Sequence, residues 1–415
     1  MLPSADLERG LGHKGAESVM RDSMVQRPAL SRNPVLGVLL ALWLLTAAGC
    51  PERETFTPPD PLYLYATYPV GKNPTSIATA DFNQDGVTDL IVTNIGNDSL
   101  SILFGNGDGS FKDQKQLRVS VEPRALALND YNGDGRTDIA VACAGSDQVV
   151  LFLGLAGGRF SEGQRYPVQR TPISIAAGDV NGDQKPDLAV ALRNDKIALL
   201  LGNGDGTFTP GPRYEYGDTP TSIALTDLTQ DGKLDLIVTN GGPMSNAVSI
   251  WTGRGDGSFR DPVDYRTGKR PLSVSFADFN ADRKTDLLVI NGERDSFVVF
   301  LGNGDGTFQD SKESGADAGP VHGVAGDFDG DRMADVAIVN IQSSNLSLLF
   351  GRGDGTFKYP PKNYRVGSGP FAVTPLSLKP DASEPPGLAV VSNGAGSVSI
   401  FLHQGTRAIA PRTAS

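Results

Sequence analysis

Six acidic loops contain the residues of this sequence that are best suited to chemistry. The first runs Asp81-Phe82-Asn83-Gln84-Asp85-Gly86-Val87-Thr88-Asp89, and similar segments begin at Asp130, Asp179, Asp227, Asp278 and Asp327. Side-chain oxygens at alternate positions of a tight loop can converge on one point, and the carbonyl of position 7 can turn inward. With water or a bidentate carboxylate, they supply the roughly six to eight oxygen ligands that Ca²⁺ accepts. The sequence therefore predicts up to six structural calcium ions.

The candidate ligands occupy positions 1, 3, 5, 7 and 9 of each loop. They are Asp81, Asn83, Asp85, Val87 and Asp89; Asp130, Asn132, Asp134, Arg136 and Asp138; Asp179, Asn181, Asp183, Lys185 and Asp187; Asp227, Thr229, Asp231, Lys233 and Asp235; Asp278, Asn280, Asp282, Lys284 and Asp286; and Asp327, Asp329, Asp331, Met333 and Asp335. Thr229 is the poorest ligand at position 3. Position 6 is glycine in loops one, two and four, whereas Gln184, Arg283 and Arg332 would be strained there if φ is positive. Loops one and two are therefore the best candidates.

An EF-hand, a magnesium site and a zinc site fit these loops less well than a calcium site does. Position 12 of loop one is Val92 rather than glutamate, and strands flank the loop, so it is not an EF-hand. Mg²⁺ demands a more regular octahedron, and no cluster of His or Cys offers ligands for zinc. Without metal, Asp and Asn could simply make side-chain-to-backbone turns. The convergence of several carboxylates in six loops favours metal, because they would otherwise repel one another.

A four-stranded unit must position each loop. In the first unit, strands are expected within residues 73–80, 90–93 and 99–104, followed by the turn Gly105 to Gly109 and a more polar last strand. The alternating apolar pattern and the Gly/Asn/Asp turns are typical of short antiparallel strands. The units recur every 48 to 51 residues, which indicates a repetitive fold such as a propeller. Its outermost strand would face water.

The glycine turn also recurs, always with a phenylalanine after it. It returns at residues 202–206, 253–257, 302–306 and 351–355 and more weakly at 154–158, and the aromatic residues are Phe111, Phe160, Phe208, Phe259, Phe308 and Phe357. Phe-Gly, the glycine turn, Gly-x-Phe and the acidic nonapeptide together resemble the FG-GAP/VCBS repeat family, whose unit builds the propeller of integrin α-chains. Over residues 61–405 the resemblance implies an all-β, seven-bladed β-propeller of four-stranded blades. It is much less specific for function.

The seventh unit is incomplete. It runs from Phe371 to about Gln404, its acidic loop has decayed at residues 379–384, and it lacks an outer strand. A surplus strand, Leu62 to Pro69, precedes the first complete unit. We therefore expect this N-terminal strand to complete blade seven and close the ring, which leaves no open edge.

The N-terminal residues 1–49 resemble a secretory signal. Basic residues precede an apolar run from Pro34 to Ala48, which is shorter than the roughly 20 residues that span a bilayer. Leu45 to Cys50 resembles a bacterial lipobox, which implies acylation of Cys50, a tether over residues 50–60 and a lipid-anchored protein at the outer membrane, on its periplasmic or surface side. Plain secretion and an uncleaved anchor are the alternatives. Residues 406–415 are a C-terminal tail.

Charge and cysteine content say little about partners. The net charge of −11 disfavours nucleic acid, but much of the acidity lies in the six loops. Two cysteines make no disulfide framework, and Cys143 is expected to be a small packed residue. Arg254-Gly255-Asp256 and Arg352-Gly353-Asp354 spell the tripeptide that integrins recognise, but sister turns carry Asn-Gly-Asp. We interpret both tripeptides as chance.

The functional surface is expected on the face opposite the acidic loops. Alternating strand direction places there the links that lead into each blade and those between its second and third strands, several of them basic. No Gly-x-Ser-x-Gly motif or phosphate loop is present, and His13, His322 and His403 are isolated. We expect a monomeric, non-catalytic module that binds a protein or mediates adhesion. A carbohydrate-binding, lectin-like propeller is the alternative, followed by a polysaccharide lyase.

Overall fold

The computed structural model describes residues 60–194, 196–215, 219–242, 246–379 and 385–404. The predicted signal segment, Cys50, the tether up to residue 59 and the C-terminal tail lie outside these residues. Within the described part of the chain, no helix is both long enough and apolar enough to cross a bilayer.

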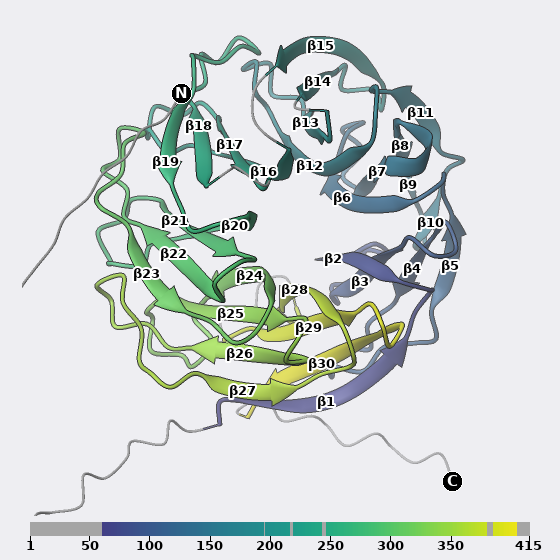
Figure 1. Ribbon diagram of the computed structural model, residues 1–415. Coiled ribbons are helices and arrows are strands. Elements are labelled where there is room, and N and C mark those ends of the chain that lie inside the picture. The colour runs from purple at the N-terminus through teal and green to yellow at the C-terminus, as the bar shows by residue number, and fades with distance from the viewer. Residues whose placement is uncertain (1–59, 195, 216–218, 243–245, 380–384, 405–415) are drawn as a thin grey trace, which may run out of the picture. The chain divides into compact units, whose positions relative to one another are not determined.

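The described residues form seven four-stranded antiparallel sheets, arranged as blades around one axis (Figure 1). From the inside outward, blade one contains β2 (Pro74–Ala80), β3 (Asp89–Asn94), β4 (Ser99–Leu103) and β5 (Lys115–Arg118), and blade two contains β6 (Pro123–Asn129), β7 (Asp138–Cys143), β8 (Gln148–Phe152) and β11 (Gln164–Pro167). Blade three contains β12 (Pro172–Gly178), β13 (Asp187–Leu192), β14 (Lys196–Gly202) and β15 (Phe208–Glu215), and blade four contains β16 (Pro220–Thr226), β17 (Asp235–Asn240), β18 (Ala247–Trp251) and β19 (Val263–Arg266).

The remaining blades follow the same order. Blade five contains β20 (Pro271–Ala277), β21 (Asp286–Asn291), β22 (Ser296–Phe300) and β23 (Lys312–Gly315), and blade six contains β24 (Pro320–Gly326), β25 (Asp335–Asn340), β26 (Asn345–Leu349) and β27 (Lys362–Arg365). Blade seven contains β28 (Pro370–Leu376), β29 (Gly387–Ser392), β30 (Ser397–His403) and β1 (Leu62–Pro69). Blade two also has a short hairpin, β9 (Gly154–Leu155) with β10 (Arg159–Phe160), and a 3₁₀ turn η1 (Ala144–Ser146).

The N-terminal strand closes the ring, as the sequence predicted. β1 pairs antiparallel with β30, from Leu62 opposite His403 to Pro69 opposite Ser397. It also reaches blade one, because the hydroxyl of Tyr68 accepts a hydrogen bond from the N–H of Phe111 at 3.1 Å. Both ends of the described chain therefore stabilise one blade, and the outer edge of β30 is paired rather than open.

Apolar cores lie between the blades. Seven clusters of buried side chains occupy the interfaces of neighbouring blades, and blade seven packs against blade one in the same way. The second strands are buried along their whole length, whereas outer strands such as β5 are largely exposed. Each blade can bury its apolar faces only against its neighbours, which is the physical reason for the repeat. Cys143 is fully buried in one of these cores, as expected.

Candidate functional site

The acidic loops fold around their own side chains. In loop one, the carboxylate of Asp81 accepts hydrogen bonds from the N–H groups of Asp85 and Gly86, at 3.1 and 2.7 Å. The amide oxygen of Asn83 accepts a second bond from the N–H of Asp85, and the carboxylate of Asp85 accepts one from the N–H of Val87, each at 2.9 Å. These are the side-chain-to-backbone bonds of the metal-free interpretation. They leave further lone pairs on each oxygen free for a cation.

The aspartate at position 9 ties each loop to the glycine turn of the same blade. One oxygen of Asp89 accepts the N–H of Phe82 at 3.0 Å, and the other accepts the N–H of Gly105 at 2.8 Å. The other five loops repeat both bonds at 2.7 to 3.0 Å. All six of these aspartates have no exposed surface. The aspartate at position 9, which the sequence suggests as a metal ligand, therefore also links the acidic loop to the glycine turn.

The carboxylates of each loop lie close enough to raise the pKa of the aspartate at position 9. Burial, together with the charges of Asp85 and Asp81, raises the pKa of Asp89 to about 6, against the two N–H donors that lower it. Burial also raises the pKa of Asp335, to about 7. In loop six, oxygens of Asp327, Asp329 and Asp335 lie within 4.8 Å of one another. A hard donor set gathered around buried like charges fits Ca²⁺.

Position 7 supplies a competing cation in most loops. Arg136 contacts Asp134 at 2.9 Å in loop two. Lysines at the same position reach the position 5 carboxylates of loops three, four and five at 3.4 to 3.9 Å. In loop six, Lys358 contacts Asp331 at 3.4 Å instead. Such exposed pairs are weak, but the sequence ranking of loop two beside loop one ignored this contact.

The backbone strain expected from the sequence is present. Position 6 has positive φ in every loop, including Gln184 at 62°, Arg283 at 64° and Arg332 at 68°. Position 4 is also left-handed, and loop five places Ala281 there with φ of 60°. Loop five therefore has two strained residues, whereas loop two has glycine at both positions.

The glycine turn docks directly on the acidic loop. A Cβ on Gly202 would lie 2.2 Å from the carbonyl oxygen of Pro186 at position 8 of loop three, and the first glycines of the other five turns meet the same obstacle at 2.1 to 2.5 Å. The turns also join blades, because the N–H of Gly206 in blade three donates to the carbonyl of Tyr131 in loop two at 3.0 Å. The two motifs occur together because they form one packed corner. We call the side of the propeller with these corners the loop face.

Both integrin-type tripeptides are part of such turns. Arg254 and Arg352 each donate from Nε to the carbonyl of their own Phe259 or Phe357, at 3.4 and 3.1 Å. Asp354 accepts from the N–H and hydroxyl of Thr356, as Asp256 does from Ser258. The tripeptides therefore contribute to the turn.

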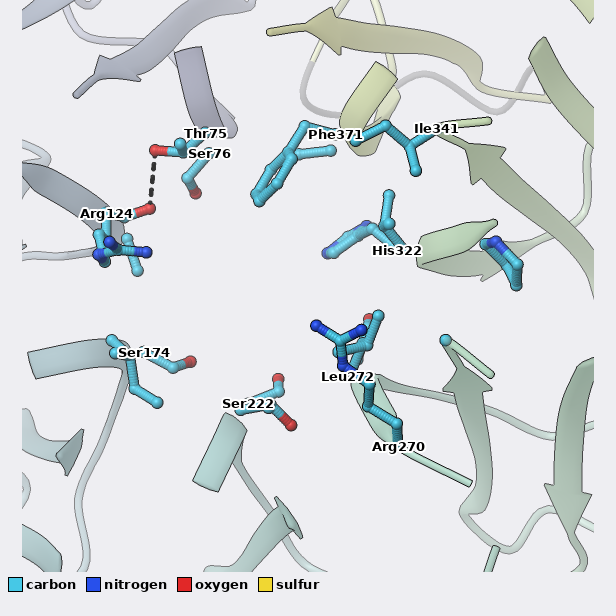
Figure 2. A pocket seen from close by; sticks show the side chains of 18 of the residues that line it. Thr75, Ser76, Arg124, Ser174, Ser222, Arg270, Leu272, His322, Ile341 and Phe371 are labelled. Atoms are coloured by element: carbon cyan, nitrogen blue, oxygen red, sulfur yellow. Dashed lines mark hydrogen bonds between the residues drawn. The ribbon is translucent and has the colours of Figure 1, made fainter. Parts of the chain in front are cut away.

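The other face is hollowed at the axis. A pocket of about 560 Å³ lies there, between the first residues of the seven innermost strands (Figure 2). Each of these strands begins with a proline and has a register shift directly after it. This bulge leaves one residue without a cross-strand partner, and all seven such residues line the pocket: Thr75, Arg124, Ile173, Thr221, Leu272, Val321 and Phe371. We call them the bulge ring and their side of the propeller the pocket face.

The pocket is lined by both cationic and apolar side chains. Arg124, Arg193, Arg270 and His322 line it, and none of the lining residues that the structure describes is acidic. Figure 2 shows His322 and the guanidinium of Arg270 pointing into the space, with Arg124 across from them. Burial lowers the pKa of His322 to about 4, so that its imidazole is neutral at neutral pH.

Sequence reasoning placed basic links on this face, among them those that carry Arg124, Arg193 and Arg270, but it did not predict a pocket or the other residues that line it. The available signal was the proline that opens every innermost strand, followed by a residue that varies between the repeats. Proline at the first strand position is common. The local sequence does not show that the residue after it lacks a cross-strand partner.

Comparison with known proteins identifies the repeat. A sequence profile of the FG-GAP-like repeat matches residues 81–141, 130–190, 179–238, 227–289 and 278–338. Among curated proteins, no sequence matches the chain significantly.

Solved structures share the fold at low sequence identity. BBS1N, in its complex with ARL6DN, is 12% identical and has a TM-score of 0.59, and the match covers 86% of this chain and 98% of that one. A lectin from Agrocybe aegerita that recognises non-reducing terminal N-acetylglucosamine is 21% identical with a TM-score of 0.50, over 77% and 86% of the two chains. A protein of unknown function from Desulfotomaculum acetoxidans is 14% identical with a TM-score of 0.52, over 70% and 86%.

Proposed function

Because this chain belongs to the FG-GAP-like repeat family, which matches more than half of its length, we propose that it is a non-catalytic, calcium-stabilised propeller that binds a protein partner. The partner binds on the pocket face. The observation that carries this proposal is the bulge ring: seven equivalent backbone positions contribute seven residues, of six residue types, to the lining of one pocket. A surface whose backbone is constant while its side chains vary is suited to recognition.

The charge and shape of the pocket face support a binding role. Val121 and Ile341 add exposed apolar surface, at 48% and 36% exposure. Isolated exposed apolar residues are common on proteins, but a concave pocket with apolar walls and a few polar groups is the usual form of a binding site. BBS1N, which shares the fold, was crystallised with a protein partner.

Calcium would be held on the loop face by the side chains at positions 1, 3, 5 and 9. When bound, it supplies positive charge that offsets the repulsion among the converging carboxylates. Its role there is structural, since the same loops fix the first strand of a blade to the second and the glycine turn to both. The pocket face would then be supported by a rigid ring.

We further propose that the protein is exported and anchored to the cell envelope by an acylated Cys50. In a membrane fractionation, the wild-type protein should sediment with membranes and a Cys50→Ala variant should be soluble. A Cys50→Ala protein that still sediments with membranes would refute the anchor and leave the binding proposal untouched.

A carbohydrate-binding function is the second candidate, because the Agrocybe aegerita lectin shares the fold at 21% identity. It is less well supported, since Phe371 is the one Phe, Tyr or Trp among the described residues that line the pocket. Glycan sites usually present aromatic platforms to sugar rings.

The proposed function is tested by photocrosslinking from matched positions on the two faces. A photoreactive residue at Ile341 or Val121 probes the pocket face, and one at Met333 or Leu155, which are 38% and 41% exposed, probes the loop face. In intact envelopes with Ca²⁺, the first pair should crosslink to one discrete protein and the second pair should not. Equal crosslinking from both faces, or none from the pocket face, would overturn the proposal.

A further inference from the structure

We propose that the axial pocket binds a carboxylate-bearing peptide segment of the partner, an Asp or Glu side chain flanked by apolar residues. Guanidinium groups lie on both sides of the pocket, Arg270 on one and Arg124 across from it, and either side can pair with the carboxylate while the apolar lining residues receive its neighbours. This inference rests on the proposed function, because it names the chemistry that the pocket face recognises.

The bulge ring makes the pocket a place where specificity can be set. A bulge re-aims a side chain without disturbing the rest of the ladder. The residue before each proline has positive φ, from 49° at Asn73 to 71° at Gly319, and its carbonyl accepts an N–H from the link after the second strand. The same strained bend is thus built seven times, and only the side chain it presents changes.

The arginines that line the pocket have hydrogen-bond donors without partners among the described residues. The Nε of Arg124 is buried and has no partner within the described residues, and its nearest acid, Glu122, is 3.8 Å from Nη2. Arg193 and Arg270 line the pocket and make no side-chain hydrogen bond or ion pair in the described part of the chain. Guanidinium groups pair with carboxylates in a bidentate manner. Three of them from blades two, three and five, with no acid among the described lining residues, make the pocket suitable for an anion in a protein of net charge −11.

The apolar part of the lining disfavours a purely polar ligand. Leu272, Val321, Ile341 and Phe371 contribute apolar surface from blades five to seven, next to Arg270 and His322. Hydroxyl groups of a sugar acid would be desolvated against this surface without partners, which is costly. Apolar side chains beside an Asp or Glu would be buried there favourably. A volume of about 560 Å³ is that of a ligand pocket rather than of a groove for a folded domain.

Polar groups around the rim suit a peptide backbone. The hydroxyls of Ser76 and Ser222 make no side-chain hydrogen bond within the described residues, and the buried Nδ1 of His322 has no partner there. Thr75 is already engaged, because its hydroxyl donates to the carbonyl of Arg124 at 3.1 Å (Figure 2). These neutral donors and acceptors lie among the cationic and apolar lining residues. They can form hydrogen bonds with the backbone amides on either side of an acidic side chain.

The test uses the full propeller with Ca²⁺ and end-blocked peptides of the sequence Gly-Leu-Asp-Ile-Gly. Binding is measured by isothermal titration or by ligand-observed NMR. A matched peptide with Asn in place of Asp removes only the charge, and an oligogalacturonate carries carboxylates on a sugar. We expect the Asp peptide to bind at least about tenfold more tightly than the Asn peptide.

Arginine variants assign this binding to the pocket. Arg270→Gln and Arg124→Gln should each weaken the Asp peptide by about tenfold or more, whereas Arg352→Gln, on the loop face, should not. The two pocket variants should melt like the wild type, which shows that the fold is intact. Equal binding of the Asp and Asn peptides, binding of oligogalacturonate alone, no binding of any probe, or no effect of the arginine variants would each overturn the inference. If the pocket-face crosslink persists in Arg270→Gln and Arg124→Gln, the proposed function stands and this inference fails.

Discussion

The loop face and the pocket face use repetition in opposite ways. On the loop face, six blades repeat the same residue types and the same contacts, down to the two N–H bonds of Asp89 and its five equivalents. On the pocket face, the backbone bend repeats in seven blades but its side chain ranges from Thr75 to Arg124 to Phe371. Side chains that are the same in every blade maintain the structure. Side chains that differ between blades, at positions with the same backbone conformation, are free to recognise a ligand. The comparison predicts that stability depends on the loop face and tolerates change on the pocket face.

Removing calcium should have the largest effect, because it acts on several loops together. Each site held at 100 times its Kd contributes about 2.7 kcal/mol to the free energy of unfolding. Chelation with EDTA should therefore lower the Tm by many degrees, and added Ca²⁺ should restore it in differential scanning calorimetry. A Tm that does not move with chelator would show that the loops are held by their hydrogen bonds alone.

Gly202→Ala, like an alanine at any of the six first glycines of the turns, should be among the most damaging single substitutions on the loop face. Its Cβ would lie 2.2 Å from the carbonyl oxygen of Pro186, so the glycine turn must separate from the acidic loop, at a cost of about 3 kcal/mol or more in the free energy of unfolding. Gly86→Ala is the control, because its φ of 77° is strained but no atom lies within 4 Å of its Cβ. Denaturant unfolding that shows equal losses for both would contradict the docking of the two motifs.

Relieving strain in loop five should stabilise the protein modestly. Arg283 has φ of 64°, and a non-glycine residue in this conformation costs about 1–2 kcal/mol. Arg283→Gly should raise the denaturation midpoint accordingly, although glycine also gains entropy in the unfolded chain. Gly135→Ala in loop two should have the opposite sign, since its φ is 79°. A destabilised Arg283→Gly would mean that the lost side chain matters more than the strain.

His322→Gln on the pocket face should have the smallest effect, visible only as a pH dependence. Burial lowers the pKa of His322 to about 4, below its usual 6.5. Between these values the unfolded chain binds the proton and the folded chain does not, so stability falls as the pH drops through this window. The wild type should therefore lose Tm relative to His322→Gln between about pH 7 and pH 5. A Tm difference that is constant with pH would show that His322 is not desolvated.

Local pattern was enough to predict most of the loop face. Positive φ at Gln184, Arg283 and Arg332 was expected because glycine stands at the same position in the other loops. The pairing of Arg136 with Asp134 was missed, since whether a side chain folds back on its own loop depends on rotamers that sequence spacing does not fix.

The sequence by itself determined the blade, the number of blades and the closure by β1, because a strand pattern repeated about every 49 residues can bury its apolar faces only against copies of itself. Only the tertiary structure decided the pocket. Thr75 and Phe371 are almost 300 residues apart in the chain, and they line one pocket because the ring closes and brings the first residues of the innermost strands, each beside a register shift, to the axis. A bulge is a property of two paired strands, so neither strand alone could reveal it.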